Sequence, residues 1–213
     1  RNSHRTSHHI LQFTYIARPG ISQHFTLSFF CKTDSILLEF FRIAFAEKFG
    51  AEKCYGSYEQ LADDPNIDIV YIASPMAQHY ENAKMCIEKG KNVLCEKTVT
   101  LNCKQLDELI LLAEKHSVFF MEAMWMKFIP AFRKAKEWIS SGKIGDIKLV
   151  RADLSSFCPY DPNDRLYANY LGGGSLLDLG VYPLTFACDF LGYKPKEIIT
   201  SAYIGKSNVD FDA

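Results

Sequence analysis

Short apolar runs alternate with longer amphipathic runs between residues 57 and 121, and this alternation constrains the fold most strongly. Residues 67–73 are almost all apolar and rich in β-branched side chains, as is typical of a parallel strand buried on both faces. Similar runs occupy residues 92–95 and 118–121. Short strands separated by helices predict right-handed βαβ units. The expected fold class is therefore α/β, a doubly wound parallel sheet with helices on both faces.

The helix boundaries are predicted by capping residues. Ser57 and Gln60 have the spacing of a capping box, which begins a short helix that Asp64 and Pro65 end. Gly90 follows a helical run in the position of a glycine that closes a last turn. Further helices are expected over residues 42–49, 77–89, 102–116 and 129–141.

The character of the sequence changes after Gly145. A long strand of mixed polarity is expected over residues 147–156, then a loop, a helix from about residue 174 to 191, and a strand over 197–204. One or two strands do not form a stable sheet. We therefore expect residues 1–124 to form one domain, and residues 125–213 to begin a second, α+β domain whose mixed or antiparallel sheet is incomplete.

Composition and charge exclude several classes of partner. The 213 residues are 48% hydrophobic, which is ample for a packed core, and the formal net charge of −1 gives no reason to expect nucleic acid. No apolar run approaches the roughly 20 residues of a membrane span, and the first residues lack a secretory signal. The seven cysteines contain no Cys-x-x-Cys pair, so we expect reduced thiols in a cytoplasmic protein. The scattered histidines predict no metal site.

Polar or ionisable residues follow three neighbouring strands of the predicted sheet. Ligands of a doubly wound sheet bind at the carboxyl ends of its strands. The sequence therefore predicts a ligand site at this edge, although ordinary loop polarity with a solvated Glu–Lys pair is the alternative. The residues are Ser74, Pro75 and His79 after the first strand, Glu96 and Lys97 after the second, and Glu122 after the third.

Lys97 and Tyr182 are the sharpest candidates for chemistry. A lysine beside a carboxylate at the rim of an apolar sheet is a charged hydrogen-bond donor or a tuned acid. Tyr182 lies four residues after Asp178, so both side chains are expected on one helix face, where Asp178 would orient Tyr182 or a neighbouring cation. A phenol near a cation can move a proton at neutral pH. The alternative is that Tyr182 belongs to the core and Asp178 is a surface charge.

Two further features have a functional and a structural interpretation. The glycine run 172–174 precedes a helix, which suits either close approach of a ligand or tight packing. Trp125 and Phe128, together with Phe157 or Tyr160, would line an apolar pocket or pack in the core.

Several ordered motifs together resemble the glucose–fructose oxidoreductase/inositol dehydrogenase (Gfo/Idh/MocA) family. They are Asp-Ile-Val-Tyr-Ile-Ala-Ser-Pro at 68–75, Gly-Lys-Asn-Val-Leu-Cys-Glu-Lys at 90–97, and Gly-Gly-Gly-Ser-Leu-Leu-Asp-Leu-Gly-Val-Tyr at 172–182. The stretch 119–130 is similar to the dihydrodiol dehydrogenase branch of that family. The resemblance covers roughly residues 42–205.

The resemblance implies a Rossmann-like NAD(P)-binding domain followed by a substrate and dimerisation domain. Family members transfer hydride between NADP or NAD and a diol, sugar or polyol. By motif, Lys97 would contact the nicotinamide ribose and the substrate oxygen, Tyr182 would be the acid or base, and Asp178 would assist. Trp125 and Tyr182 would contact the substrate, and a complete second domain would support a homodimer. The residues expected along the cofactor are Ser74, Pro75, His79, Glu96 and Lys97.

The sequence departs from the family in two places. Thr98 stands where the family has proline, whose fixed φ helps to set the direction of the lysine. The Gly-x-Gly-x-x-Gly turn expected near the start is missing, because Gly20 is the only glycine among the first 40 residues. Residues 25–30 fit the second strand, with Asp34 near the adenosine ribose. The missing turn supports an alternative function, an inactive fragment that acts as a binding or interaction protein.

Overall fold

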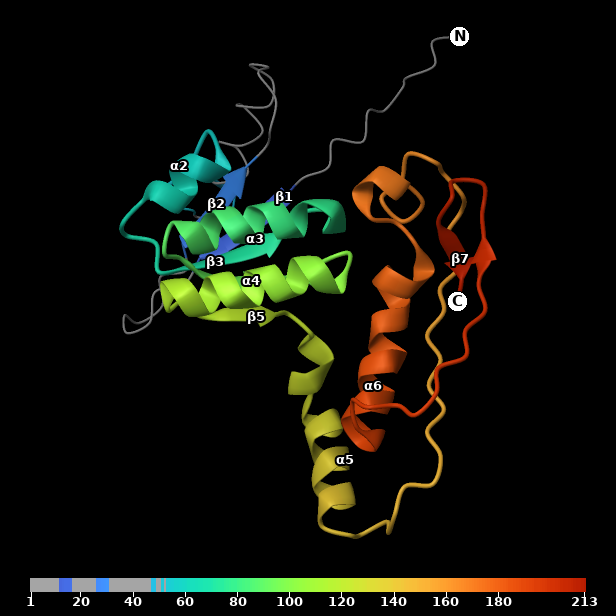
Figure 1. Cartoon of the computed structure of the whole chain (residues 1–213). Coiled ribbons are helices and arrows are strands. Elements are labelled where there is room, and N and C mark those ends of the chain that lie inside the picture. The colour runs from blue at the N-terminus through green and yellow to red at the C-terminus, as the bar shows by residue number, and fades with distance from the viewer. Residues whose placement is uncertain (1–11, 17–25, 31–46, 49–50, 52) are drawn as a thin grey trace. The chain divides into compact units, whose positions relative to one another are not determined.

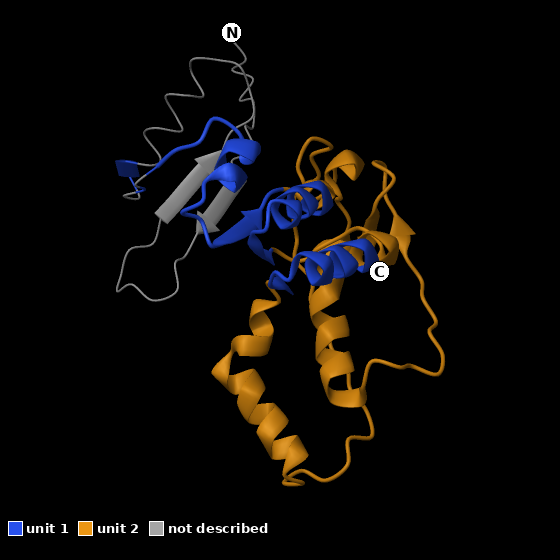
Figure 2. Cartoon of the chain, turned by 60° about the vertical axis from the view of Figure 1, so that its left-hand side comes forward, with its two compact units in different colours: residues 1–74, 79–95, 107–121 blue, residues 75–78, 96–106, 122–213 orange. Residues whose placement is uncertain are grey.

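The computed structural model describes residues 12–16, 26–30, 47–48, 51 and 53–213. The chain forms two compact units (Figure 2). Unit 1 comprises residues 1–74, 79–95 and 107–121, and unit 2 comprises residues 75–78, 96–106 and 122–213. The boundary expected between residues 124 and 125 stays a prediction. Gly20, Asp34 and most of the helix expected over 42–49 lie outside the described residues.

A five-stranded sheet organises the first part of the chain (Figure 1). Its strands lie in the order β2-β1-β3-β4-β5. Their bounds are Gln12–Ile16 for β1, Thr26–Phe30 for β2, Ile69–Ala73 for β3, Asn92–Cys95 for β4 and Phe120–Glu122 for β5. β3 and β4 are parallel, with Ile69 opposite Asn92. The predicted strands at 67–73, 92–95 and 118–121 are therefore present, with small shifts at their ends.

The first two strands do not follow the parallel pattern predicted for the sheet. β1 is antiparallel to β2 and to β3, with Phe13 opposite Ala73. Only residues 17–25 separate β1 from β2, and a parallel crossover needs a dozen or more residues. As a result, the carboxyl end of β1 lies at the opposite edge of the sheet from the carboxyl ends of β3 and β4.

The helices of this region are capped largely as the sequence predicts. They are α2 (Tyr58–Asp63), α3 (His79–Glu88) and α4 (Cys103–His116), with the short 3₁₀ helix η1 (Met76–Gln78) before α3. The hydroxyl of Ser57 accepts from the Gln60 N–H at 3.1 Å, while the Gln60 side chain accepts from the Gly56 N–H at 2.8 Å. Asn102 caps α4 through the Gln105 N–H at 3.1 Å, and Gly90 has a φ of +72°.

The core of unit 1 lies between the sheet and its helices. Alternate residues of β3 and β4 are fully buried, and α3 packs against both strands. The largest side chains with almost no exposure are Leu61, Val70, His79, Ile87, Val93, Cys95 and Leu109. The predicted site residues Ser74 and Glu96 follow β3 and β4 directly in the chain.

Unit 2 is built around two helices that lie side by side in both views (Figures 1 and 2). They are α5 (Pro130–Ser140) and α6 (Val181–Leu191). Phe132 of α5 contacts Phe186 and Phe190 of α6, with ring centroids 5.9 and 5.4 Å apart. The remaining elements are η2 (Trp125–Phe128), η3 (Asn169–Leu171), the π-helix η4 (Leu176–Gly180), β6 (Tyr203–Ile204) and β7 (Asp210–Asp212). No helix among the described residues is long and apolar enough to cross a bilayer.

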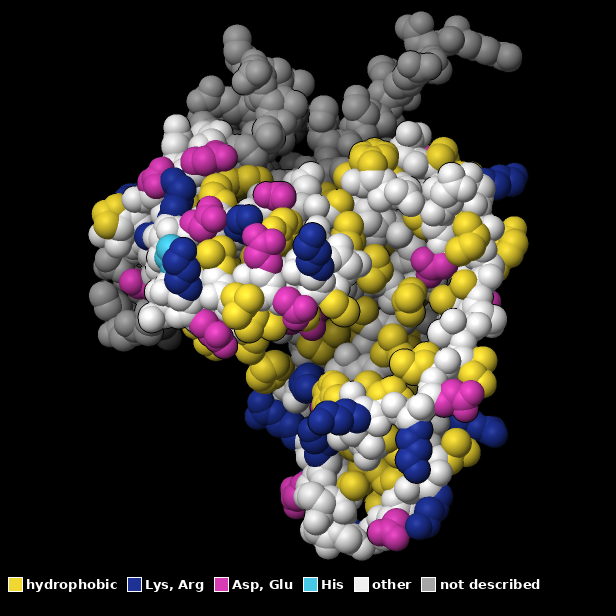
Figure 3. All heavy atoms as spheres, viewed as in Figure 1, with side chains coloured by type: hydrophobic (Ala, Val, Ile, Leu, Met, Phe, Trp, Pro, Cys, Tyr) yellow, Lys and Arg dark blue, Asp and Glu magenta, His cyan; other side chains and the backbone are white. Residues whose placement is uncertain are grey.

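Two strands predicted for the second domain differ in the structure. Residues 145–160 form neither helix nor strand, so the strand expected at 147–156 is absent. Of the strand expected at 197–204, only Tyr203–Ile204 forms, paired with β7 in an antiparallel sheet. A strand exists only where a neighbour completes its hydrogen bonds, and β6–β7 is the one pairing in the described part of unit 2. Hydrophobic side chains therefore remain on the surface here (Figure 3), Phe157 at 92% exposure.

Candidate active site

The ammonium of Lys97 pairs with Asp178. Lys97 Nζ donates to Asp178 Oδ1 at 2.8 Å and to the Asp178 carbonyl at 2.5 Å. The side chains are only 14% and 15% exposed. The neighbouring carboxylate of Glu96 instead accepts the backbone N–H of Lys97 at 3.2 Å. Of the two carboxylates that the sequence offered, the ammonium is thus held by the one 81 residues later in the chain and not by its immediate neighbour.

The π-helix η4 explains why a backbone carbonyl is available to Lys97. In the five-residue register of a π-helix, the carbonyl of Asp178 would accept from the N–H of residue 183. Residue 183 is proline, which has no N–H. The preceding carbonyl, that of Leu177, accepts from the Thr98 hydroxyl at 2.7 Å. Consecutive side chains after β4 therefore contact consecutive carbonyls of η4.

Tyr182 lies one helical turn after Asp178 and faces both Lys97 and Trp125. Lys97 Nζ is 5.1 Å from the centroid of the Tyr182 ring. Trp125 Nε1 donates to Tyr182 Oη at 2.8 Å, and the two rings meet edge to face at 63°. Tyr182 also packs against the core of Met124, Met126 and Phe132. The two interpretations of Tyr182 are therefore compatible, because its ring packs on the core and its hydroxyl lies at the site.

The charges around Asp178 favour its ionised form. Burial acts to raise the pKa of this carboxyl, but the hydrogen bond and charge of Lys97 outweigh burial and hold the pKa below its ordinary range. Arg165 adds to this effect through Nη1, 3.4 Å from Asp178 Oδ1. The site is therefore a carboxylate between two cations. Arg165 was missed by sequence reasoning, since an arginine in an irregular loop gives no periodic signal.

Two buried or partly buried carboxylates, Glu122 and Asp189, hold together the segments that carry the site. Glu122, at the end of β5, accepts from the backbone N–H of Val99 at 3.0 Å and so holds the chain that follows Lys97. The side chain of Asp189 in α6 is 2% exposed and binds Lys127 of η2 at 3.0 Å and Lys136 of α5 at 3.2 Å. Asp189 also accepts from the Tyr193 hydroxyl. The sequence did not predict this cluster, which joins α6 to η2 and α5.

The residues expected along the cofactor after β3 have local partners. In unit 1, Ser74 is buried, its carbonyl lies 2.7 Å from His79 Nε2, and its hydroxyl accepts from Asn82 at 3.0 Å. His79 is 1% exposed. In unit 2, the carbonyl of Pro75 accepts from the Gln78 N–H at 2.9 Å and so begins η1. These contacts order the loop after β3, and the cofactor roles stay predictions.

The glycine run 172–174 is explained by close packing. Gly172 has a φ of +82°, and a Cβ there would lie 3.0 Å from side-chain atoms of Met76 and Leu101. A Cβ on Gly173 would lie 2.7 Å from the Leu166 carbonyl. The backbone N–H of Leu176, at the start of η4, donates to the Asp210 carboxylate at 2.5 Å. The structure therefore favours the packing interpretation of this run.

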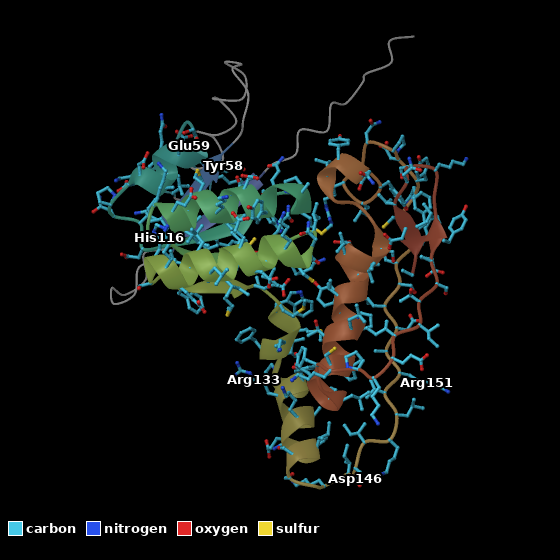
Figure 4. The ribbon with its side chains drawn as sticks, in the orientation of Figure 1. Tyr58, Glu59, His116, Arg133, Asp146 and Arg151 are labelled. Atoms are coloured by element: carbon cyan, nitrogen blue, oxygen red, sulfur yellow. The ribbon has the colours of Figure 1, made fainter. Side chains whose placement is uncertain are left out.

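The predicted aromatic residues are not brought together around Trp125. The ring of Phe128 lies under Arg133, 5.4 Å from the guanidinium carbon. Arg133 lies on the side of α5 that faces away from α6 (Figure 4). Tyr160 packs against Tyr167 and Phe211. Unit 2 instead offers a cavity of about 650 Å³ that borders Asp178 and Arg165. Its wall also includes residues 152–156 and 210–213.

Comparison with known proteins matches both parts of the chain to one family. The model of the Gfo/Idh/MocA oxidoreductase family, NAD-binding Rossmann fold, matches residues 22–124. The model of the Gfo/Idh/MocA C-terminal domain matches residues 132–212. The predicted α/β fold class, a Rossmann-like sheet followed by the start of an antiparallel sheet, is confirmed.

Individual relatives are dehydrogenases and a ketoreductase. Trans-1,2-dihydrobenzene-1,2-diol dehydrogenase of Xenopus laevis is 40% identical over 78% of this chain and 50% of its own length. D-xylose 1-dehydrogenase (NADP(+)) of Hypocrea jecorina is 40% identical over 68% of this chain and 39% of its own length.

A solved oxidoreductase structure is also similar to this chain. KijD10, a 3-ketoreductase of Actinomadura kijaniata in complex with NADP and TDP-benzene, has a TM-score of 0.60 and 30% identity over 70% of this chain and 46% of its own. The chain spans about half the length of the relatives it matches. The resemblance of the motifs at 68–75, 90–97 and 172–182 is thus confirmed, and the chain belongs to the Gfo/Idh/MocA oxidoreductase family.

Proposed function

We propose that this chain is an NAD(P)-dependent oxidoreductase that transfers hydride between nicotinamide and a carbinol carbon of a diol, sugar or polyol. The observation that carries the proposal is the position of the Lys97 ammonium, bonded to Asp178 and 5.1 Å from the ring centroid of Tyr182. The dihydrodiol and D-xylose dehydrogenase relatives support the substrate class. When bound, the nicotinamide supplies the hydride donor or acceptor.

Tyr182 exchanges the proton of the substrate hydroxyl in this proposal. The indole N–H of Trp125 can only donate, so the Tyr182 oxygen must accept from it. The phenolic proton therefore remains available for a substrate oxygen. A cation beside the phenol stabilises the negative charge that appears when the proton leaves. Lys97 supplies that cation, and Asp178 holds it in place.

The residues present fit the nicotinamide end of the cofactor better than its diphosphate end. A lysine and a phenol at one site are suitable partners for ribose and substrate hydroxyls. Ser74, Pro75, His79 and Glu96 would lie along the cofactor. No Gly-x-Gly-x-x-Gly turn occurs in the chain, and β1 runs antiparallel to β3. These two observations favour a second candidate, a catalytically inactive binding or interaction protein without the diphosphate loop.

We further propose the roles of the two halves and the setting of the protein. Residues 1–124 would bind the cofactor, and residues 125–213 would bind the substrate and take part in a homodimer. The cavity of about 650 Å³ beside Asp178 has room for a small molecule. All six cysteines within the described residues are free thiols, which supports a reducing cytoplasmic setting.

A cofactor titration separates the two candidates. The chain is titrated with NADPH and with NADH, followed through the fluorescence of Trp125 and Trp138, and turnover is measured with trans-1,2-dihydrobenzene-1,2-diol and D-xylose. Saturable binding with turnover supports the oxidoreductase, and a folded chain that binds neither nucleotide supports the second candidate.

Two substitutions then test the assigned residues. Lys97→Met and Tyr182→Phe should each lower turnover by at least about a hundredfold, the usual scale for a positioned acid or base. Lys134→Met and Tyr170→Phe are matched controls on exposed side chains. Unchanged turnover in both site variants would refute the assignment.

A further inference from the structure

Thr98 and Lys97 donate to neighbouring carbonyls of the same helix. The Thr98 hydroxyl lies 2.7 Å from the Leu177 carbonyl, and Lys97 Nζ lies 2.5 Å from the Asp178 carbonyl. Both donors follow β4 directly, and both acceptors belong to η4. The hydroxyl contact lies next to the ammonium contact, so it restrains the segment that carries the lysine.

The Thr98 hydrogen bond can restrain Lys97 more than the lysine restrains itself, because the lysine side chain is flexible. Lysine has four rotatable side-chain bonds and loses substantial entropy when its ammonium is held in one place. A hydroxyl has a short reach, so its hydrogen bond restrains the backbone itself. Thr98 lacks the fixed φ that a proline would give at this position. Its hydrogen bond to Leu177 provides a restraint of a different kind.

We propose that Thr98 is a positioning residue, whose hydroxyl holds the segment after β4 against η4 and so fixes the Lys97 ammonium at Asp178 and Tyr182. A role of Thr98 in catalysis rests on the proposed function. The restraint of Lys97 by Thr98 depends only on the Thr98–Leu177 and Lys97–Asp178 contacts. The two can therefore be tested separately.

The geometric test measures how well Lys97 is protected from acetylation. The chain is treated with limiting acetic anhydride, and acetylation of Lys97 is quantified by mass spectrometry relative to Lys134, whose side chain is 51% exposed. Lys97 is 14% exposed and should react slowly. Thr98→Val removes the hydroxyl at constant shape and should speed acetylation of Lys97 about fivefold, the change in a local equilibrium that one lost hydrogen bond produces.

Three further variants make the result specific. Thr98→Ser keeps the hydroxyl and should restore the wild-type rate. Thr98→Ala removes it without the bulk of valine, and gives the answer if Thr98→Val does not fold. Thr100→Val is the matched control, because the Thr100 hydroxyl also donates to a backbone carbonyl, that of Asn102, at 3.1 Å. Wild-type protection in Thr98→Val and Thr98→Ala, or equal loss of protection in Thr100→Val, would overturn the proposal.

A kinetic arm links positioning to the reaction. Thr98→Val should lower kcat about fivefold, and Thr98→Ser should recover kcat. A chain that binds neither nucleotide refutes the proposed function, yet its acetylation still reports on Lys97. Faster acetylation of Lys97 with an unchanged kcat would show that the Thr98 hydrogen bond does not contribute to turnover.

Discussion

Replacing Asp189 by asparagine should markedly lower the free energy of unfolding. Its side chain is 2% exposed and accepts from Lys127, Lys136 and the Tyr193 hydroxyl. Asparagine keeps the size but removes the charge. Hydrogen bonds to charged groups contribute about 1.5–3 kcal/mol each. The two lysines are 39% and 46% exposed and can rehydrate, so we expect a net loss of about 2 kcal/mol.

Urea unfolding followed by tryptophan fluorescence measures this loss. A change of about 2 kcal/mol lowers the melting temperature of a chain of this length by about 6 °C. Asp146→Asn is the matched control, because Asp146 also pairs with a lysine at 3.2 Å but is 87% exposed (Figure 4). The control should leave the free energy of unfolding unchanged. Equal effects of the two substitutions would show that burial of Asp189 contributes nothing.

The pH dependence gives an independent check on Asp189. Burial acts to raise the pKa of its carboxyl, but hydrogen bonds from Tyr193, Lys127 and Lys136 hold the pKa below the ordinary value of 3.8. A lowered pKa in the folded state stabilises the fold above the unfolded value, and this contribution disappears as the pH falls through the folded value. The difference between wild type and Asp189→Asn should therefore be constant from neutral pH to about pH 5, and shrink below about pH 4. A constant difference down to pH 2 would contradict this.

Three further substitutions or reactions test the description of the fold. Ser57→Ala should cost about 1 kcal/mol in urea unfolding, because it removes the acceptor of the Gln60 N–H, and Ser57→Asp should restore it. Phe186→Ala should cost about 3 kcal/mol, because this half-buried ring contacts two other phenylalanines, and a loss below about 1 kcal/mol would contradict the packing. Burial raises the pKa of the Cys86 thiol to about 12, so iodoacetamide at pH 8 should label exposed Cys103 and leave Cys86 unmodified until the protein unfolds.

The correct predictions from sequence rest on local patterns. The strands at 69–73 and 92–95 are visible because each is a short, mostly apolar run between turn residues, and alternate side chains of both are buried. Ser57 and Asn102 mark helix starts because capping depends on residues within one turn. The wrong predictions, at 147–156 and most of 197–204, concern strands, since a strand needs a partner that its own sequence does not reveal.

The candidate site was likewise predicted only in part. Lys97, Asp178 and Tyr182 were selected from the sequence, because strand ends and the four-residue helical period restrict where side chains can point. The sequence offered two carboxylates near a cation, Glu96 beside Lys97 and Asp178 on the helix, and the structure pairs Lys97 with Asp178. Arg165 gave no signal at all, since its position beside Asp178 depends on the path of an irregular loop.

The sequence alone determined, to within about two residues, where helices and strands begin and end in the core of unit 1, and it marked Lys97, Asp178 and Tyr182 as candidates for the site. Hydrophobic period and capping act over a few residues, so they can be read along the chain. Only the tertiary structure decided that β1 runs antiparallel to β3, that Thr98 binds Leu177 and that Asp189 joins α6 to η2 and α5. These contacts connect segments far apart in sequence, and such contacts depend on how the elements pack rather than on any local pattern.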